Sequence, residues 1–359
     1  MRIDEIDSNF RSQQIGDEVI HFLDARKAPF VVEGFPWSRT DQALYRLPPH
    51  FTKNEVNEGQ LRLAHHTSGG VVRFATDARY IALRASLHEN CDMDHMPRTG
   101  SMGFDLYRGH GADSIHVATV KPQRDQIQIE QIIVGNEAGM QEWLLHLPLY
   151  SGVDSLEIGV SPDAMIKEPM PHRIEAPVAF YGSSITQGAC ASRPGNAYPA
   201  MLCREMDVEL INLGFAGAAH GEMSLAEAIS ELQLSAFVMD YDHNPATVEP
   251  LRATHEPFFK IIRERQPDLP ILLISRCDFW DYKNTEACRE RREVIRRTWR
   301  HANACGDQNV YFIDGEQLFG DRHRPWCTVD TCHPNDLGFY KIFEHVLPIL
   351  KQALSNHSY

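Results

Sequence analysis

Short segments in which apolar and polar residues alternate fill the first half of the chain. They lie at residues 71–87, 114–120, 127–134 and 144–160. Such alternation is typical of strands that bury one face, and turn sequences such as Ser68-Gly69-Gly70 separate the segments. Only residues 14–26 suggest an amphipathic helix in this half. The pattern therefore predicts a β-sandwich.

The second half has a different hydrophobic pattern, in which apolar runs alternate with segments of helical length. The apolar runs lie at residues 178–181, 208–213, 236–241, 271–274 and 310–313. Helical periodicity is clearest at residues 248–265, 285–301 and 336–354. Continuous apolar strands separated by helices are typical of a parallel sheet that is covered on both faces. This half therefore predicts a doubly wound α/β domain.

A proline-rich stretch separates the two halves with these different hydrophobic patterns. It runs from residue 161 to residue 177 and contains four prolines, as expected of a linker. The chain has 359 residues, roughly twice the length of a typical single domain. We therefore place a β-sandwich domain at residues 1–172 and an α/β domain at residues 173–359.

The charge of the chain narrows the choice of partners. Asp and Glu number 49 against 35 Lys and Arg, so the formal net charge at pH 7 is −14. A negative surface repels phosphate backbones and anionic lipids, and we expect neither nucleic acid nor a membrane as a partner. The sequence contains no apolar run of about 18 residues. Its first ten residues lack the basic and apolar parts of a signal peptide, so we expect a cytoplasmic protein.

The cysteines favour neither disulfides nor a metal site. Eight cysteines in a chain of this length are too few for a disulfide scaffold. Cys327 and Cys332 lie close to an Asp and a His, but a C-x4-C pair without a second pair fits the spacing of structural zinc sites poorly. We expect reduced thiols, no metal and no cofactor.

Chemically active residues follow the predicted strands of the second half. In an open α/β sheet, ligands bind outside the carboxyl ends of the strands. The turns at those ends carry Ser184, Gly217 and Asn244, and the loop before the last helix carries Asp330 and His333. A serine becomes a nucleophile when an imidazole takes its proton and a carboxylate orients that imidazole. The N–H groups of Ser184 and Gly217, with the Asn244 amide, would then stabilise an oxyanion.

Each of these residues also has a purely structural interpretation. The Ser184 turn resembles an ordinary helix cap, Gly217 allows close packing, and Asn244 fits an Asx turn. Asp330 and His333 fit the start of the last helix. Taken one at a time, none of these residues decides between the two interpretations, so the order in which they occur along the chain has to decide.

In this order the residues resemble the four sequence blocks of the GDSL or SGNH hydrolases, across residues 176–355. Two positions depart from the family pattern. Ser183 occupies the place of the usual Asp, and Asp242-His243-Asn244-Pro245 replaces the usual Gly-x-Asn-Asp. The resemblance implies a flavodoxin-like parallel sheet. It also implies a catalytic triad of Ser184, Asp330 and His333, and an oxyanion hole made by Ser184, Gly217 and Asn244.

A second resemblance lies in the first half. Residues 103–107 read Gly-Phe-Asp-Leu-Tyr, similar to the Gly-x-Asp-Leu-Tyr signature of an accessory domain that precedes one subgroup of these hydrolases. That subgroup has a jelly-roll-like β-sandwich before the catalytic domain. Together with the four blocks downstream, the signature assigns the chain to this subgroup.

The resemblance implies a serine esterase or deacylase that works through an acyl-enzyme. The expected substrates are acyl esters, above all acetyl esters, of a carbohydrate or a small glycoside. One alternative is an acyltransferase that uses the same triad to acylate a sugar or metabolite hydroxyl. A more remote alternative is a non-catalytic carbohydrate-binding protein. The sequence does not determine the oligomeric state, and a homo-oligomer is among the states that it allows.

Three residues are candidates for contacts with substrate. Arg193 follows the nucleophile turn and would orient a carboxylate or hydroxyls, although an Arg in that position also fits a simple ion pair. Trp280 and Trp326 lie in loops on the active-site side of the domain. Their rings would stack on a sugar or pack within the loops.

Overall fold

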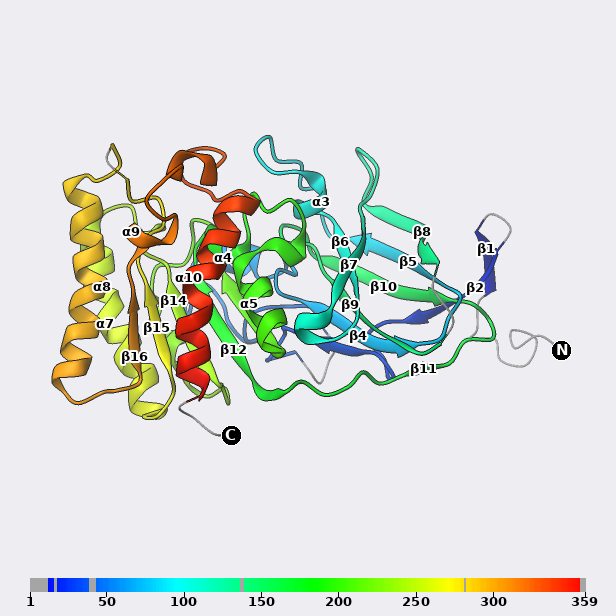
Figure 1. Ribbon diagram of the computed structural model, residues 1–359, viewed down its shortest axis with the longest axis horizontal. Helices are drawn as coiled ribbons and strands as arrows, with labels where there is room; N and C mark the ends of the chain where they lie inside the picture. Colours follow the sequence, from blue (N-terminus) through cyan, green and yellow to red (C-terminus); the bar gives the residue numbers. More distant parts are fainter. Residues whose placement is uncertain (1–11, 16–17, 39–42, 136–138, 281, 356–359) are drawn as a thin grey trace.

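The computed structural model describes residues 12–15, 18–38, 43–135, 139–280 and 282–355. Figure 1 shows strand-rich and helix-rich parts lying side by side along the long axis of the molecule. The chain passes from the first part to the second through β11 (Ile166–Lys167) and the segment that follows it. No helix in the described ranges is long and apolar enough to cross a membrane.

Two antiparallel sheets form the first part. One has the strand order β1-β2-β10-β5-β8, and the other has the order β11-β4-β9-β6-β7, with β3 paired to β4. The strands are β1 (Ser12–Ile15), β2 (Glu18–Asp24), β3 (Val31–Glu33), β4 (Val71–Thr76), β5 (Tyr80–Leu87), β6 (Phe104–Arg108), β7 (Ile115–Val120), β8 (Gln128–Gly135), β9 (Gln141–His146) and β10 (Val153–Val160). Alternate residues of both sheets, such as Phe74, Leu83 and Leu145, are fully buried in one core. The predicted β-sandwich is confirmed.

The expected helix at residues 14–26 is wrong. The structure has β1 and β2 there, and β2 pairs antiparallel with β10, with Phe22 opposite Gly159. The apolar residues at positions 19, 20, 22 and 23 fit the helical and the strand period equally well. Pairing with β10, which buries Ile20 and Phe22, selects the strand.

A five-stranded parallel sheet forms the second part. Its order is β13-β12-β14-β15-β16, which is the flavodoxin-like order 2-1-3-4-5. The strands are β12 (Ile174–Gly182), β13 (Val208–Gly214), β14 (Ala236–Asp240), β15 (Ile271–Ile274) and β16 (Val310–Ile313). The doubly wound, flavodoxin-like α/β fold predicted from the sequence is confirmed.

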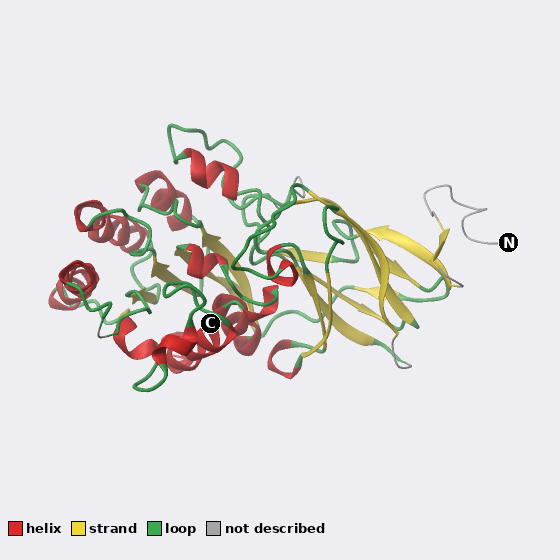
Figure 2. Cartoon of the chain, turned by 90° about the horizontal axis from the view of Figure 1, so that it is seen from above, coloured by secondary structure: helices red, strands yellow, loops and turns green. Residues whose placement is uncertain are grey.

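Helices cover both faces of this sheet (Figure 2). They are α4 (Ser184–Gln187), α5 (Tyr198–Met206), α6 (Met223–Ser230), α7 (Val248–Arg265), α8 (Glu286–Ala304), α9 (Gly315–Leu318) and α10 (Asp336–Ser355). Successive residues of β12 point to opposite faces. Val178 and Phe180 share a core with α5 and α10, whereas Ala179 and Tyr181 share one with α6, α7 and α8. The three helices expected from periodicity thus lie on the faces that their apolar stripes require.

The two parts of the chain are joined by a shared core. Residues 45–66, which include α2 (Glu58–Leu63), lead from β3 to β4 in the sequence of the sandwich. Yet Leu47, Val56 and Leu63 are buried in the same cluster as Ile211 and Phe258 of the α/β part. The first half of the chain therefore completes the hydrophobic packing of the second.

A buried arginine holds this segment in place. Arg46 is fully buried, and its guanidinium donates to the carbonyl oxygens of Leu63, His66, Asn212 and Gly214 at 2.6 to 2.9 Å. Burial lowers the pKa of Arg46 to about 9, which leaves it charged at neutral pH. Four charge-assisted hydrogen bonds compensate for the loss of water around the guanidinium.

Candidate active site

Ser184, His333 and Asp330 form a hydrogen-bonded chain after the carboxyl ends of the parallel strands. Oγ of Ser184 lies 3.0 Å from Nε2 of His333, and Nδ1 of His333 lies 2.7 Å from Oδ2 of Asp330. A carboxylate only accepts hydrogen bonds, so Nδ1 carries the ring proton and Nε2 is left to accept the proton of Ser184. The geometry is that of a nucleophile, a base and an orienting carboxylate.

The loop of Asp330 keeps this carboxylate ionised. Its Oδ1 accepts the backbone N–H groups of Cys332 and His333 at 3.0 and 2.7 Å. Partial burial by itself would raise the pKa of Asp330. The hydrogen bond from the His333 ring and those from the two N–H groups outweigh burial and lower the pKa to about 2. Asp330 is therefore negatively charged across the physiological pH range.

The turn that carries Ser184 is held by the serine before it. Ser184 is the first residue of α4, and Oγ of Ser183 accepts the N–H of Ile185 at 3.2 Å. Ser183 is thus the N-cap, a position for which Ser and Asp are both preferred. The departure from the family's Asp at this position leaves the helix cap intact.

A buried carboxylate ties α4 to the neighbouring strand. Asp240, at the end of β14, accepts hydrogen bonds from Oγ1 of Thr186 and the hydroxyl of Tyr198 at 2.9 and 2.8 Å. Burial raises the pKa of Asp240 to about 7. Gly182 lies against the backbone of the same residue, since a Cβ there would come within 2.4 Å of the Asp240 carbonyl oxygen. These contacts fix the turn that presents Ser184.

Gly217 and Asn244 contact each other. The N–H of Gly217 donates to Oδ1 of Asn244 at 3.1 Å, and Nδ2 of Asn244 donates to the carbonyl oxygen of Phe215 at 2.9 Å. Asn244 keeps one further amide hydrogen for a ligand. The N–H of Gly217 is engaged with Asn244 here, so it serves an oxyanion only when this bond opens or is shared. The oxyanion role of these residues stays a prediction.

The backbone conformation explains the glycine at position 217. Its φ is +68°, and a Cβ there would meet nothing within 4 Å. Close packing, the structural interpretation offered above, is therefore not the reason for this glycine. The left-handed conformation is the reason, because it disfavours any residue with a side chain.

Arg291 is a positioning residue that sequence reasoning missed. Its guanidinium donates to the carbonyl oxygens of Asp242 and Pro245 at 2.6 and 2.7 Å, on either side of Asn244. Charged residues are frequent in α8, so Arg291 did not stand out. The available signal was its place on the buried stripe of that helix, three residues after Cys288 and three before Val294.

A second missed contact joins the sandwich to the Gly217 loop. Gln187 accepts the N–H of Ala216 through Oε1 at 3.0 Å, and its Nε2 lies 3.2 Å from Nδ1 of His66. Nε2 of His66 in turn lies 2.7 Å from Glu89. Burial lowers the pKa of His66 to about 4, so this histidine is neutral and connects the two parts through hydrogen bonds.

The three predicted substrate contacts have different surroundings. Arg193 donates to Oδ2 of Asp105 at 2.8 Å and to the Tyr107 hydroxyl at 2.5 Å. Trp280 is 5% exposed and belongs to a hydrophobic core, which leaves almost none of its ring open for stacking. Trp326 is 63% exposed, and its carbonyl oxygen accepts the side chain of Asn335, two residues after His333. Of the three, only Trp326 is largely exposed, and one face of its indole stacks on the His323 ring with the centroids 4.0 Å apart.

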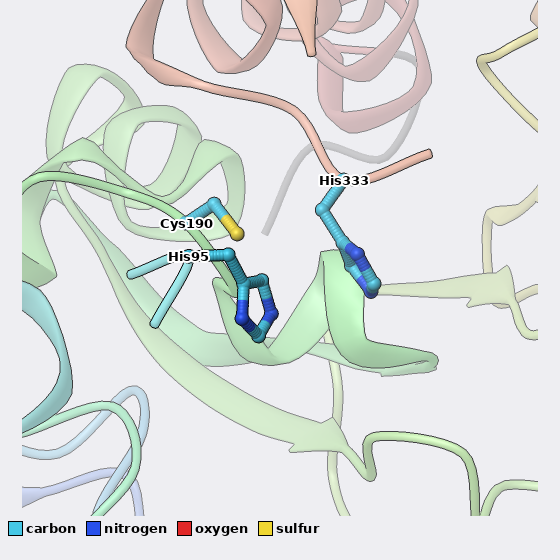
Figure 3. A group of neighbouring side chains, drawn as sticks. All are labelled: His95, Cys190 and His333. Atoms are coloured by element: carbon cyan, nitrogen blue, oxygen red, sulfur yellow. The ribbon is translucent and has the colours of Figure 1, made fainter. Parts of the chain in front are cut away.

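Two further side chains approach His333. His95, at the tip of a turn of the sandwich, and Cys190, just after α4, lie with His333 around one space (Figure 3). One ligand atom of each residue lies within 4.8 Å of those of the other two. The sequence predicted no metal, because these residues are far apart along the chain. All eight cysteines are free thiols.

Comparison with known proteins agrees with this architecture. A flavodoxin-like sheet with a Ser–His–Asp chain at its carboxyl edge defines an α/β protein of the serine-hydrolase type. Residues 175–351 match the family model of the GDSL-like lipase/acylhydrolase family, and residues 20–166 match that of the N-terminus of SGNH-hydrolase-type esterases, named GxDLY. The chain belongs to the GDSL/SGNH hydrolase family, in the subgroup with a GxDLY-type sandwich. Both resemblances noted in the sequence are confirmed.

Several solved structures share the fold. A GDSL-like lipase from Bacteroides ovatus is 29% identical, with a TM-score of 0.84 over 94% of this chain and 98% of its own. A salicylyl-acyltransferase from a tetracycline biosynthetic pathway is 21% identical, with a TM-score of 0.74 over the same shares. A family two carbohydrate esterase from Clostridium thermocellum, in complex with cellohexaose, is 14% identical, with a TM-score of 0.61 over 80% and 93%. No curated protein matches the chain.

Proposed function

We propose that this protein is a serine esterase or deacylase that acts through an acyl-enzyme. The observation that carries the proposal is the chain of hydrogen bonds from Ser184 through His333 to the ionised Asp330. Such an arrangement activates a hydroxyl that is otherwise a weak nucleophile. The reaction needs no cofactor, because the three side chains supply nucleophile, base and orienting charge.

The reaction follows from the positions of the protons. Oγ of Ser184 attacks the ester carbonyl carbon while Nε2 of His333 takes its proton, and the charged imidazole then gives this proton to the departing alcohol. Water attacks the resulting acyl-serine with His333 again as base, which releases the acid and restores Ser184. The N–H of Ser184 and the free amide hydrogen of Asn244 bind the oxyanion, joined by Gly217 when its bond to Asn244 opens.

For the substrate, we propose acyl esters, above all acetyl esters, of a carbohydrate or small glycoside. The exposed Trp326 supports this, since its backbone carbonyl accepts the side chain of Asn335 near His333 and aromatic rings are suited to contact with sugar rings. The carbohydrate esterase from Clostridium thermocellum has the same fold and was solved with cellohexaose. These points favour a sugar as the alcohol part of the ester.

Hydrolysis of p-nitrophenyl acetate, butyrate and octanoate tests the proposal. We expect cleavage of acetate ahead of the longer esters, and complete dependence on Ser184. Ser184→Ala removes the nucleophile, and Ser183→Ala is the matched control because it removes only the helix cap. Turnover retained in purified, folded Ser184→Ala would contradict the assignment.

Acyl transfer to an alcohol is a second candidate, because the same acyl-serine forms in both reactions. Since a salicylyl-acyltransferase shares the fold across 94% of this chain, hydrolysis and acyl transfer have to be measured side by side. Product analysis with added sugars separates the two activities: free acid identifies a hydrolase, and a new sugar ester identifies a transferase. If neither product forms while acetylated oligosaccharides still bind, the non-catalytic binding protein is the correct alternative.

A further inference from the structure

Three metal-binding side chains meet beside Ser184, and they come from three separate parts of the chain. His95 lies in the turn between Met93 and Met96 of the sandwich. Cys190 follows α4, and His333 belongs to the loop before α10. The three ligand atoms lie within 4.8 Å of one another, and the rings of His95 and His333 are 5.8 Å apart. Figure 3 shows the three side chains around a common space.

The contact between the two parts of the chain fixes the backbone around this cluster. Oγ1 of Thr99, in α3 (Arg98–Ser101), donates to the carbonyl oxygen of Ser192 at 2.5 Å. The N–H of Ser192 donates to Oδ1 of Asp336 at 2.8 Å. A Cβ on Gly100 would come within 2.1 Å of the carbonyl oxygen of Ala191. The segments of His95, Cys190 and His333 are therefore held together by short contacts a few residues away.

The donor set points to one class of cation. Two imidazoles and a thiolate are ligands that Zn²⁺ and similar thiophilic ions prefer, whereas Mg²⁺ and Ca²⁺ prefer oxygen. Nδ1 of His333 is already engaged with Asp330, so Nε2 is the atom left for a cation. A carboxylate on the far nitrogen of a metal-binding histidine is the usual supporting contact in zinc sites.

We propose that His95, Cys190 and His333 form an inhibitory binding site for a thiophilic divalent cation, for which Zn²⁺ is the probe. The ion binds Nε2 of His333, a ring nitrogen of His95 and Sγ of Cys190, and the thiol proton passes to solvent, so that one proton is released per ion. The lone pair of Nε2 is then held in the metal bond and no longer accepts the proton of Ser184. The inhibition rests on the proposed function, but the binding does not.

Access and adjustment both depend on His95. Cys190 is 4% exposed, whereas His95 is exposed at the tip of its turn. Bonds of roughly 2.0–2.3 Å to zinc require donor atoms less than about 4 Å apart, so the cluster has to contract slightly on binding. His95 is the exposed member and the one able to rotate inward. The ion would enter from its side.

Binding is measured first, in a protein that cannot turn over. Ser184→Ala keeps all three ligands, and Zn²⁺ is titrated against a chromophoric chelator while proton release is followed. We expect one ion and one proton per chain, and no competition by Mg²⁺. Adding His95→Gln or Cys190→Ala should weaken binding by at least about tenfold. The matched controls His88→Gln and Cys305→Ala should leave it unchanged. No binding, or binding that survives both ligand substitutions, overturns the site.

Inhibition is measured second, in the active protein. Zn²⁺ should slow ester hydrolysis, a chelator should restore it, and the inhibition constant should shift in His95→Gln and Cys190→Ala by the same factor as binding. Each variant is compared with its own metal-free rate. Binding in a protein that hydrolyses no ester upholds the site and removes the proposed function. Binding without inhibition of an active enzyme overturns His333 as a ligand.

Discussion

Asp105 and Arg193 join the two parts of the chain through an ion pair of 2.8 Å, and the side chain of Asp105 is completely buried. The same carboxylate accepts the N–H of Gly195 at 3.1 Å, and the Tyr107 hydroxyl also accepts from Arg193. Asp105 and Tyr107 are the Asp and the Tyr of the Gly-x-Asp-Leu-Tyr sequence. The signature is therefore explained by the hydrogen bonds that its Asp and Tyr make with the segment after the nucleophile turn.

Removing one side of this pair should destabilise the protein. Asp105→Asn leaves the guanidinium of Arg193 largely buried without its countercharge, and we expect a loss of about 3–5 kcal/mol in the free energy of unfolding. Chemical denaturation of Asp105→Asn, Arg193→Ala and the double variant measures the coupling between the two residues. Additive losses would mean that the ion pair contributes nothing specific.

Asp330→Asn should lower kcat by about 10³–10⁴-fold with little change in KM, because the amide no longer fixes the tautomer of His333. The wild-type pKa of about 2 has a second consequence. The stability that Asp330 contributes is present above the unfolded pKa of 3.8 and is lost as the pH falls through about 2. Because Asp330 stays ionised down to about pH 2, any fall in activity between pH 7 and pH 4 must come from the protonation of another group. Rates measured from pH 4 to 9 for the wild type and Asp330→Asn test both the drop in kcat and this assignment.

Asn244→Ala should lower kcat by about 10²–10³-fold, the usual effect of removing one oxyanion donor. The variant also frees the N–H of Gly217 from its present acceptor, so part of the lost stabilisation should return through that group. Steady-state kinetics of Asn244→Ala against Asn244→Asp separates the two effects. The aspartate still accepts from Gly217 but has no amide to donate. Equal kcat in all three proteins would exclude an oxyanion role for this residue.

A largely buried histidine between the two parts should make stability depend on pH. His172 lies 3.0 Å from Glu33 and 2.9 Å from Asp207, and Arg73 and His110 contact the same carboxylates. Burial lowers the pKa of His172, but the hydrogen bond and charge of Glu33 outweigh it, and the net shift is upward. The stability that His172 contributes is therefore present below about pH 6.5 and is lost as the pH rises through the raised folded-state pKa.

Melting temperatures from pH 5 to 9 test this dependence. We expect the wild type to lose stability toward high pH and His172→Gln to show a flatter curve. At acid pH the dependence runs in the opposite direction, and stability falls as the pH falls. The pKa values of Glu33 and Asp207 are lowered despite burial, by hydrogen bonds from His172 among other contacts, so their contribution is lost as the pH falls through those lowered values. Parallel curves for the two proteins would show that His172 is not the titrating group.

Trp326→Ala should raise KM for acetylated oligosaccharides several-fold and leave p-nitrophenyl acetate hydrolysis nearly unchanged. The reason is that a small ester has no sugar ring to contact the exposed indole. Trp326→Phe is the matched variant, since it keeps an aromatic face. The same KM change with both substrates would place Trp326 in the scaffold of the catalytic loop.

The sequence predicted the elements whose signal is local. The apolar runs at 178–181 and 271–274 became β12 and β15, and the stripe at 248–265 became α7 with the same bounds. Ser184, Asp330 and His333 were predicted as one site because strand ends in a parallel sheet meet at one edge, and the structure brings the three together. For each of these strands and for α7, one stretch of sequence contains the whole signal.

Residues whose role depends on a distant partner were missed or misread. Arg193 fitted a substrate contact, but its partner Asp105 lies 88 positions away. Arg46 and Arg291 bind carbonyl oxygens of distant loops, and a backbone carbonyl leaves no mark in a sequence. His95 joins the site only because the sandwich lies against the α/β part. Pairings of this kind follow from the tertiary fold, which residue patterns alone do not specify.

The shared core also bears on how the chain folds during synthesis. Residues 45–66 leave the ribosome well before the strands and helices that bury Leu47, Val56 and Leu63. A nascent sandwich must therefore carry these apolar side chains uncovered until residues 211–262 have been made. Domains usually fold in order as they emerge, but here the first one stays incomplete while the second is translated. Growing chains of this protein should thus be clients for chaperones over that interval.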